Sequence, residues 1–195
     1  MTTAAILAGG HARRMAGRDK SQVLIGGKTI LERQVRALDG LVTRIWLVGY
    51  RGTVPPDLPV SVLADRRLDC GPLGGLDAAL AAAGQDDVLL LACDLPNVTR
   101  SMLAHLIHLR GDADAVVPRT ERGYHPLCAV YAQSCRRPVE RRLEEGSLRM
   151  QDLLSELKVQ VVSERELDAF GESDRLLANV NTLADLDALE SLRNH

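Results

Sequence analysis

Short, uninterrupted apolar segments alternate with helical patterns along most of this 195-residue chain. The clearest apolar segment is DVLLLACD at 87–94, and a run without polar alternation is typical of a strand buried on both faces of a parallel sheet. Other strands are expected at 4–9, 44–49, 59–65, 113–118, 126–131 and 159–162. This alternation predicts a three-layer α/β/α fold on a Rossmann-like, doubly wound and mostly parallel sheet.

The helical segments between these strands carry end signals. In 28–40, Thr29 and Glu32 have the spacing of a capping box, and Gly40 can close the helix. Further helices are expected at 75–84, 99–111, 134–145, 150–157 and 183–192. No linker, repeat or low-complexity segment divides the chain, so we expect a single domain over 1–195.

Composition excludes several functional classes. The net charge is −2 and aromatic residues are 3%, which argues against a dedicated nucleic-acid binder. No apolar run reaches the length of a membrane span, and no signal peptide is evident, so a cytoplasmic protein that binds neither membrane nor nucleic acid is expected. The cysteines lack zinc-site spacing and are expected to be reduced thiols; they are Cys70, Cys93, Cys128 and Cys135.

The loop after the first strand, LAGGHARRMAGRDK at 7–20, combines glycines with basic residues. Gly9 and Gly10 would let the backbone approach a ligand closely, and cationic side chains would surround a polyphosphate. Those side chains are Arg13, Arg14, Arg18 and Lys20. Two common phosphate motifs are missing. G-x-G-x-x-G does not follow this strand, which disfavours a Rossmann dehydrogenase, and GGKT at 26–29 has Gln22 where a P-loop needs glycine.

Two acidic residues stand at the carboxyl ends of expected strands. Asp65 ends one and Asp94 ends the central one, and ligands of open parallel sheets bind at that edge. Because Mg²⁺ prefers one or two carboxylates together with phosphates and water, Asp94 is the candidate metal ligand. A role in the following turn is the alternative. Asp19 and Asp65 both stay open as a second ligand. GPLGG at 71–75, before the expected helix, fits either an anion site or a plain turn.

Several segments, in order, resemble the molybdenum cofactor guanylyltransferases, the MobA family of nucleotidyltransferases. They are LAGGHARRMAGRDK at 7–20, GPLGG at 71–75, CDLP at 93–96, YHPLCAVY at 124–131, LEEGSLRMQDLL at 143–154 and NVNTLADL at 179–186. The resemblance implies a fold of the nucleotide-diphospho-sugar transferase type. It also implies transfer of GMP from GTP to the terminal phosphate of molybdopterin, with release of pyrophosphate. Ala16 departs from the usual glycine of the family.

The resemblance also implies roles for individual residues. The catalytic group would be Arg14, Lys20 and Asp94, with Mg²⁺ on Asp94. GTP would be bound by Leu7, Ala8, Gly9, Gly10, Lys20, Asp65 and Asp94, the first three through backbone groups. The pterin side would involve His125, Arg149, Asn179 and Asn181. No nucleotide contact is expected at Gly49.

Other interpretations stay open. His125 could be a structural histidine at a strand start, and the two asparagines could only shape the turn before a helix. An enzyme of the same fold could use another donor or acceptor, as in a molybdopterin cytidylyltransferase or a sugar-phosphate nucleotidyltransferase. A non-catalytic carrier of the molybdenum cofactor would need the pterin face without the metal. For the guanylyltransferase itself, transient contact with other molybdenum-cofactor proteins is an expectation.

Overall fold

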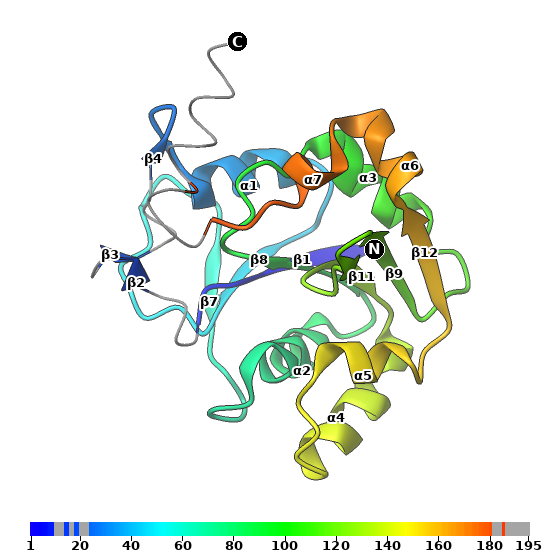
Figure 1. Cartoon of the computed structure of the whole chain (residues 1–195). Coiled ribbons are helices and arrows are strands. Elements are labelled where there is room, and N and C mark those ends of the chain that lie inside the picture. Colours follow the sequence, from blue (N-terminus) through cyan, green and yellow to red (C-terminus); the bar gives the residue numbers. More distant parts are fainter. Residues whose placement is uncertain (10–13, 16–17, 20–23, 181–184, 186–195) are drawn as a thin grey trace.

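A computed structural model describes residues 1–9, 14–15, 18–19, 24–180 and 185 of the chain. Its main body is an eight-stranded mixed sheet between two layers of helices (Figure 1). The three-layer α/β/α architecture predicted from the sequence is confirmed. Within the described residues, no helix is long and apolar enough to cross a membrane.

The sheet combines a parallel half with a half that contains antiparallel strands. In the parallel half the order is β7 (Ser61–Leu63), β6 (Ile45–Val48), β1 (Thr2–Leu7) and β8 (Asp87–Ala92). Antiparallel pairing then joins β8 to β11 (Cys128–Tyr131), β11 to β9 (Ala115–Thr120), and β9 to β10 (Gly123–Tyr124). Strand β12 (Val159–Ser163) pairs parallel with β9.

Strands β1 and β8 form the centre of the sheet. They pair in register over six residues, from Thr2 opposite Asp87 to Leu7 opposite Ala92. The leucines of β8 are fully buried but alternate between faces: Leu89 contributes to one apolar cluster and Leu90 to the other. The continuous apolar run is therefore explained, because both faces of this strand are covered by helices.

The helices divide between the two faces of the sheet (Figure 1). One layer contains α1 (Ile30–Leu38), α3 (Arg100–His108), α6 (Glu164–Leu167) and α7 (Ser173–Leu176). The other contains α2 (Gly71–Ala83), α4 (Arg136–Glu144) and α5 (Met150–Leu154). Short 3-10 turns precede α4 at 133–135 and follow α6 at 168–170. The predicted capping box of α1 is present, with Thr29 and Glu32 bonding each other's backbone N–H.

The start of α2 differs from the prediction. The helix was expected from residue 75, with GPLGG before it as either an anion site or a plain turn, but it begins at Gly71 and those residues form its first turns. Pro72 is compatible with this position because the first helical N–H groups need no partner within the helix. Gly75 lies against β1, where an added Cβ would be 2.5 Å from Cδ2 of Leu7. Glycine there permits close helix–strand packing. In the sequence alone, the same glycines indicate a turn.

Smaller elements were not predicted. Two hairpins precede α1: β2 (Arg14–Met15) pairs with β3 (Arg18–Asp19), and β4 (Leu24–Ile25) pairs with β5 (Lys28–Thr29). Strands of two residues are too short to show a period of two. The helix expected at 183–192 lies outside the described residues apart from Asp185, which is helical.

Candidate active site

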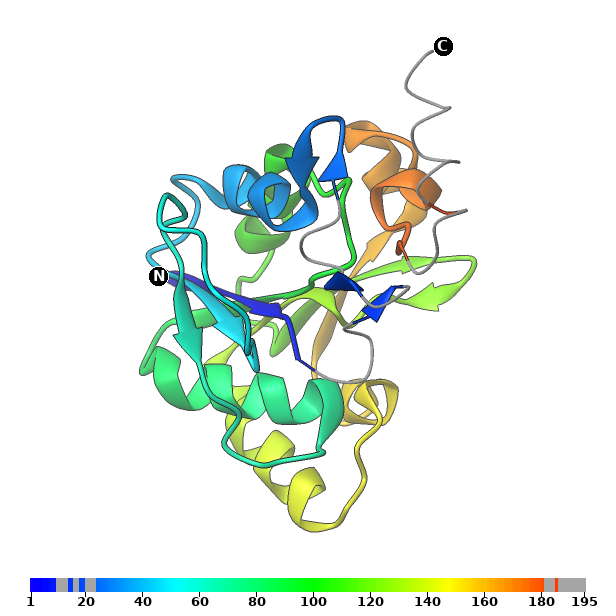
Figure 2. The same cartoon turned by 90° about the vertical axis from the view of Figure 1, so that its left-hand side faces the viewer.

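The carboxyl ends of the parallel strands meet at one edge of the sheet. Hydrogen bonds continue past the strands: Gly49 N–H donates to the Leu63 carbonyl over 3.0 Å, and Cys93 N–H donates to the Leu7 carbonyl over 3.3 Å. Figure 2 views the molecule from the side at which β1 ends, with the β2–β3 hairpin in front of the sheet. This edge is where an open α/β sheet binds its ligands.

Gly9, Gly49 and Asp65 are packed together at this edge. A Cβ placed on Gly49 would lie 2.7 Å from Oδ2 of Asp65 and 3.2 Å from the Cα of Gly9. Gly49 also has a φ of +68°, a conformation that other L-residues adopt at a cost. Gly49 therefore leaves the space that the Asp65 carboxylate occupies beside the first loop. No nucleotide contact was expected at Gly49, although its place directly after a strand was a signal.

Asp94 lies at the end of β8, next to the late asparagine motif. The backbone N–H of Val180 donates to the carbonyl oxygen of Asp94 over 2.9 Å. Asp94 is half-buried, Val180 is buried, and Asn179 is exposed beside them. Asn97, just beyond Asp94, also donates from Nδ2 to the Arg175 carbonyl over 3.0 Å. The fold thus joins the candidate metal ligand to a candidate pterin residue that is far from it in sequence.

His125 lies at the same edge, on the other side of β8. Leu127, which precedes β11, accepts a hydrogen bond from Ala92 N–H over 2.8 Å. The His125 Nε2 atom is 2.9 Å from Oγ1 of Thr120, which also accepts from Arg122 N–H over 3.2 Å. Burial, followed by the nearby positive charge of Arg122, lowers the pKa of His125. The neutral imidazole is therefore favoured, and Thr120 fixes its orientation.

The remaining predicted residues either lie away from this edge, lie in the β2–β3 hairpin, or are outside the described residues. Arg149 is exposed at the start of α5, in the helical layer opposite α7. The backbone of Arg14 forms part of β2 and pairs with Asp19. Gly10, Lys20 and Asn181 lie outside the described residues. The structure accordingly brings together Gly9, Asp65, Asp94, His125 and Asn179 at one edge.

The donor set at this edge suits a hard divalent cation that keeps most of its own water. In the described part of the chain, no three His, Cys, Asp or Glu side chains cluster as a metal site. Zinc-type coordination by several protein ligands is therefore not built here among those residues. A single carboxylate such as Asp94 fits Mg²⁺, which takes its remaining ligands from water and substrate phosphates.

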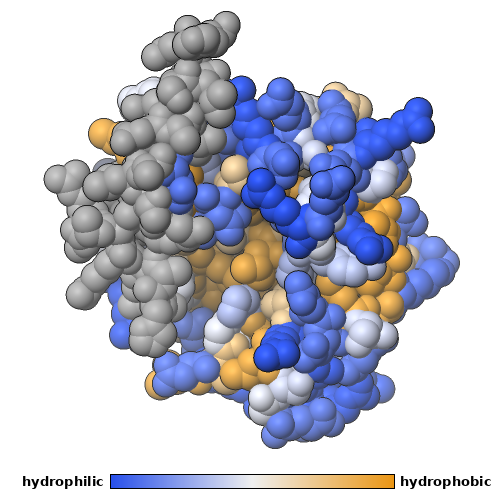
Figure 3. Space-filling model, viewed as in Figure 1, coloured by the Kyte–Doolittle hydropathy of each residue, from blue (hydrophilic) through white to orange (hydrophobic). Residues whose placement is uncertain are grey.

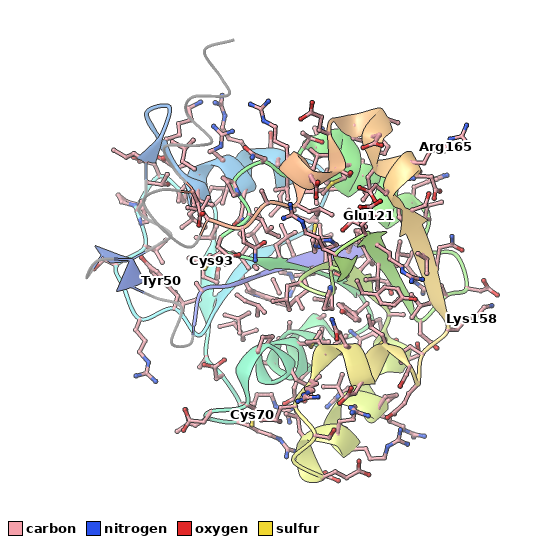
Figure 4. The ribbon with its side chains drawn as sticks, viewed as in Figure 1. Tyr50, Cys70, Cys93, Glu121, Lys158 and Arg165 are labelled. Atoms are coloured by element: carbon pink, nitrogen blue, oxygen red, sulfur yellow. The ribbon has the colours of Figure 1, made fainter. Side chains whose placement is uncertain are left out.

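The surface between the two helical layers is mixed in polarity. Hydrophobic surface is visible in the middle of the face shown in Figure 3, with polar surface above and below it. Cys93, the neighbour of Asp94, is labelled near the centre of the same face, with Cys70 below it near α2 (Figure 4). A pocket of about 380 Å³ lies beside the start of β6, and one of about 280 Å³ lies between α1 and Pro96, just beyond Asp94. Neither pocket is lined by Asp65 or Asp94.

Comparison with known proteins decides the family. Residues 4–161 match the MobA-like NTP transferase domain. The chain belongs to this family. A molybdenum cofactor guanylyltransferase of Desulfosudis oleivorans is 31% identical to this MobA-like chain, covering 97% of it and 94% of the relative.

Solved structures share the fold of this MobA-like protein. Molybdopterin-guanine dinucleotide biosynthesis protein A of Archaeoglobus fulgidus has a TM-score of 0.79 and 25% identity, over 98% of each chain. A Mycobacterium tuberculosis protein solved as a complex with manganese has a TM-score of 0.63 and 16% identity, over 97% of this chain and 98% of that one. At that identity the second comparison concerns the fold alone.

Proposed function

We propose that this protein is a molybdenum cofactor guanylyltransferase. It transfers GMP from GTP to the terminal phosphate of molybdopterin and forms the guanine dinucleotide form of the cofactor. A phosphate oxygen of the acceptor attacks the α-phosphorus of GTP, the bond from that phosphorus to the bridging oxygen breaks, and pyrophosphate leaves. The observation that carries this proposal is the convergence of Gly9, Asp65 and Asp94 at one sheet edge of a MobA-like chain.

The nucleotide would lie on the Gly9 side of this edge. Ala8 N–H already donates to the Val48 carbonyl over 3.0 Å, and the Leu7 carbonyl already accepts from Cys93. The Leu7 and Ala8 carbonyl oxygens keep acceptor capacity beyond these bonds, so backbone contacts to guanosine are proposed at Leu7, Ala8 and Gly9, with Gly10 next to them. The Asp65 carboxylate, held against Gly49, would accept hydrogen bonds from O–H or N–H groups of the nucleoside.

The phosphates need positive charge because two anionic groups must come within bonding distance. Two unit charges about 4 Å apart repel by about 1 kcal/mol in water and about 4 kcal/mol at an effective dielectric of 20. Arg14 and Lys20 are the proposed fixed cations, and Asp94 is the proposed ligand of Mg²⁺. When bound, Mg²⁺ would offset charge on the phosphates and on the departing pyrophosphate. Positioning and charge suffice for this chemistry, so no covalent nucleophile is required.

The acceptor would approach from the other side of Asp94. Asn179 is exposed there, and His125 presents a neutral ring held by Thr120. If the Thr120 hydroxyl donates to Nε2, the ring carries its hydrogen on Nδ1 and can donate to an oxygen of the acceptor. Asn181 and Arg149 stay as proposed pterin contacts. A cytoplasmic location and transient contact with other molybdenum-cofactor proteins also stay predictions from the sequence.

The test supplies purified protein, molybdopterin and each labelled nucleoside triphosphate with Mg²⁺, and measures pyrophosphate and the dinucleotide product. We expect GTP to be the preferred donor and removal of Mg²⁺ with a chelator to stop turnover. Asp94→Ala should lower kcat by at least about a hundredfold while the protein stays folded. Preference for CTP, turnover with a sugar phosphate alone, or cofactor binding without turnover would each reject the proposal in favour of a named alternative.

A further inference from the structure

Helix α2 buries a carboxylate that the proposed chemistry does not use. Asp77 is fully buried on a helix otherwise made of glycine, alanine, leucine and proline. Its Oδ1 atom lies 3.0 Å from Nη1 of Arg66, and its Oδ2 atom has no hydrogen-bond partner among the residues that the structure describes. A buried charge with one partner is costly, so its presence requires an explanation.

The partner of Asp77 connects it to the sheet edge. Arg66 belongs to the segment 65–70 between β7 and α2, and it directly follows Asp65. Its side chain is 45% exposed, and the same Nη1 atom lies 3.8 Å from Oε1 of Glu140 on α4. The ion pair therefore fixes the main chain next to Asp65 onto a helix that packs against β1, β6 and β8.

The segment 65–70 has little secondary structure of its own to hold it. Asp69 has a φ of +57°, and it is the one non-glycine residue with positive φ in the described part of the chain. At the far end, Gly74 N–H donates to the Cys70 carbonyl over 3.2 Å as α2 begins. At the near end, the Asp65 carboxylate must keep its place against Gly49, and the buried Asp77–Arg66 contact is next to it.

We infer that Asp77 is a positioning residue: through Arg66 it holds the segment that carries Asp65, and so sets the place of the carboxylate that receives the nucleoside. This inference rests on the proposed function, since it assigns a mechanical support to the nucleotide half of that site. Asp77 itself is buried beside α4 and Arg66, so it would act through Arg66 without contacting the substrates. It acts on affinity for GTP and leaves the acceptor side unchanged.

The decisive variant is Asp77→Asn, which keeps the size of the side chain and removes its charge. Burial raises the pKa of Asp77 in spite of Arg66, so the buried charge carries a desolvation cost that Asp77→Asn removes. We therefore expect Asp77→Asn to melt at or above the temperature of the unchanged protein. The KM for GTP should rise about tenfold because Asp65 is less well placed. The KM for molybdopterin should stay within about twofold.

Two further variants separate positioning from packing. Arg66→Gln should raise the KM for GTP as Asp77→Asn does, and the double variant should raise it no further, since both changes break one contact. The control is Arg67→Ala, which removes the neighbouring exposed ion pair to Glu144 at 3.9 Å and should leave the KM for GTP unchanged. A KM for GTP within about twofold of the original in folded Asp77→Asn would overturn the inference, and so would an equal rise in Arg67→Ala.

Failure of this inference differs from failure of the proposed function. If Asp65→Asn raises the KM for GTP but Asp77→Asn does not, Asp65 contacts the nucleotide without needing this support. If Asp65→Asn itself leaves GTP binding unchanged, the assigned nucleotide contact is wrong, and the positioning role falls with it.

Discussion

At the scale of single residues, two glycines make room at the sheet edge where the nucleotide is proposed to bind. Gly9 and Gly49 lie close enough that an added Cβ on either would be 3.2 Å from the other's Cα. Only Gly49 also has a positive φ and faces the Asp65 carboxylate. A motif search finds Gly9 because it lies in the basic loop. The need for Gly49 arises from contacts among the loops that follow three different strands.

Replacing Gly49 should therefore impair both stability and nucleotide binding. Gly49→Ala combines a left-handed backbone with a Cβ 2.7 Å from Oδ2 of Asp65. We expect a loss of about 1–3 kcal/mol in the free energy of unfolding and a KM for GTP raised about tenfold. The matched control is Gly40→Ala, which has a similar φ of +65° at the end of α1, far from this edge. It should lose stability without a change in KM, and an unchanged KM in Gly49→Ala would contradict this account.

At the scale of elements, long strands and helices follow their sequence patterns, while short elements do not. The run at 87–94 and the capping box of α1 were both found where predicted, since each depends on neighbours in sequence. The start of α2 was misplaced because glycine and proline are read as turn residues. In the fold, Gly75 leaves room for Cδ2 of Leu7 in β1, which lies far away in the chain.

A larger side chain at that contact should weaken the packing of α2 on the sheet. Gly75→Val would place atoms where Cδ2 of Leu7 lies 2.5 Å from the new Cβ, and overpacking of this kind costs about 1–3 kcal/mol. Urea unfolding should show this loss as a lower midpoint. Ala82→Val, on an exposed position of the same helix, controls for the helix propensity of valine and should change stability by less than about 1 kcal/mol. Equal losses of stability in both variants would show that the contact of residue 75 with β1 does not cause the loss.

At the scale of the whole molecule, stability should depend on pH through the buried carboxylate of α2. The pKa of Asp77 is raised above its ordinary value of 3.8, first by burial. The folded state therefore binds this proton more tightly than the unfolded state. The contribution of Asp77 to stability falls as pH rises from its unfolded-state pKa to its raised folded-state pKa. Asp77→Asn lacks this dependence. Its stability relative to the unchanged protein should increase from pH 4 toward pH 7, measured by urea unfolding at each pH. A difference that shrinks as pH rises would contradict the assigned burial.

The sequence alone determined the layered α/β class, the strand that lies at its centre, the basic glycine loop and the two acidic strand ends, because each depends on residues close together in the chain. Tertiary structure decided which of these features meet. It placed Val180 on the carbonyl of Asp94, Asp65 against Gly49, and Arg66 on the buried Asp77. Most of these contacts join loops that follow different strands, and their energies depend on distance and burial, which arise only when the sheet is assembled.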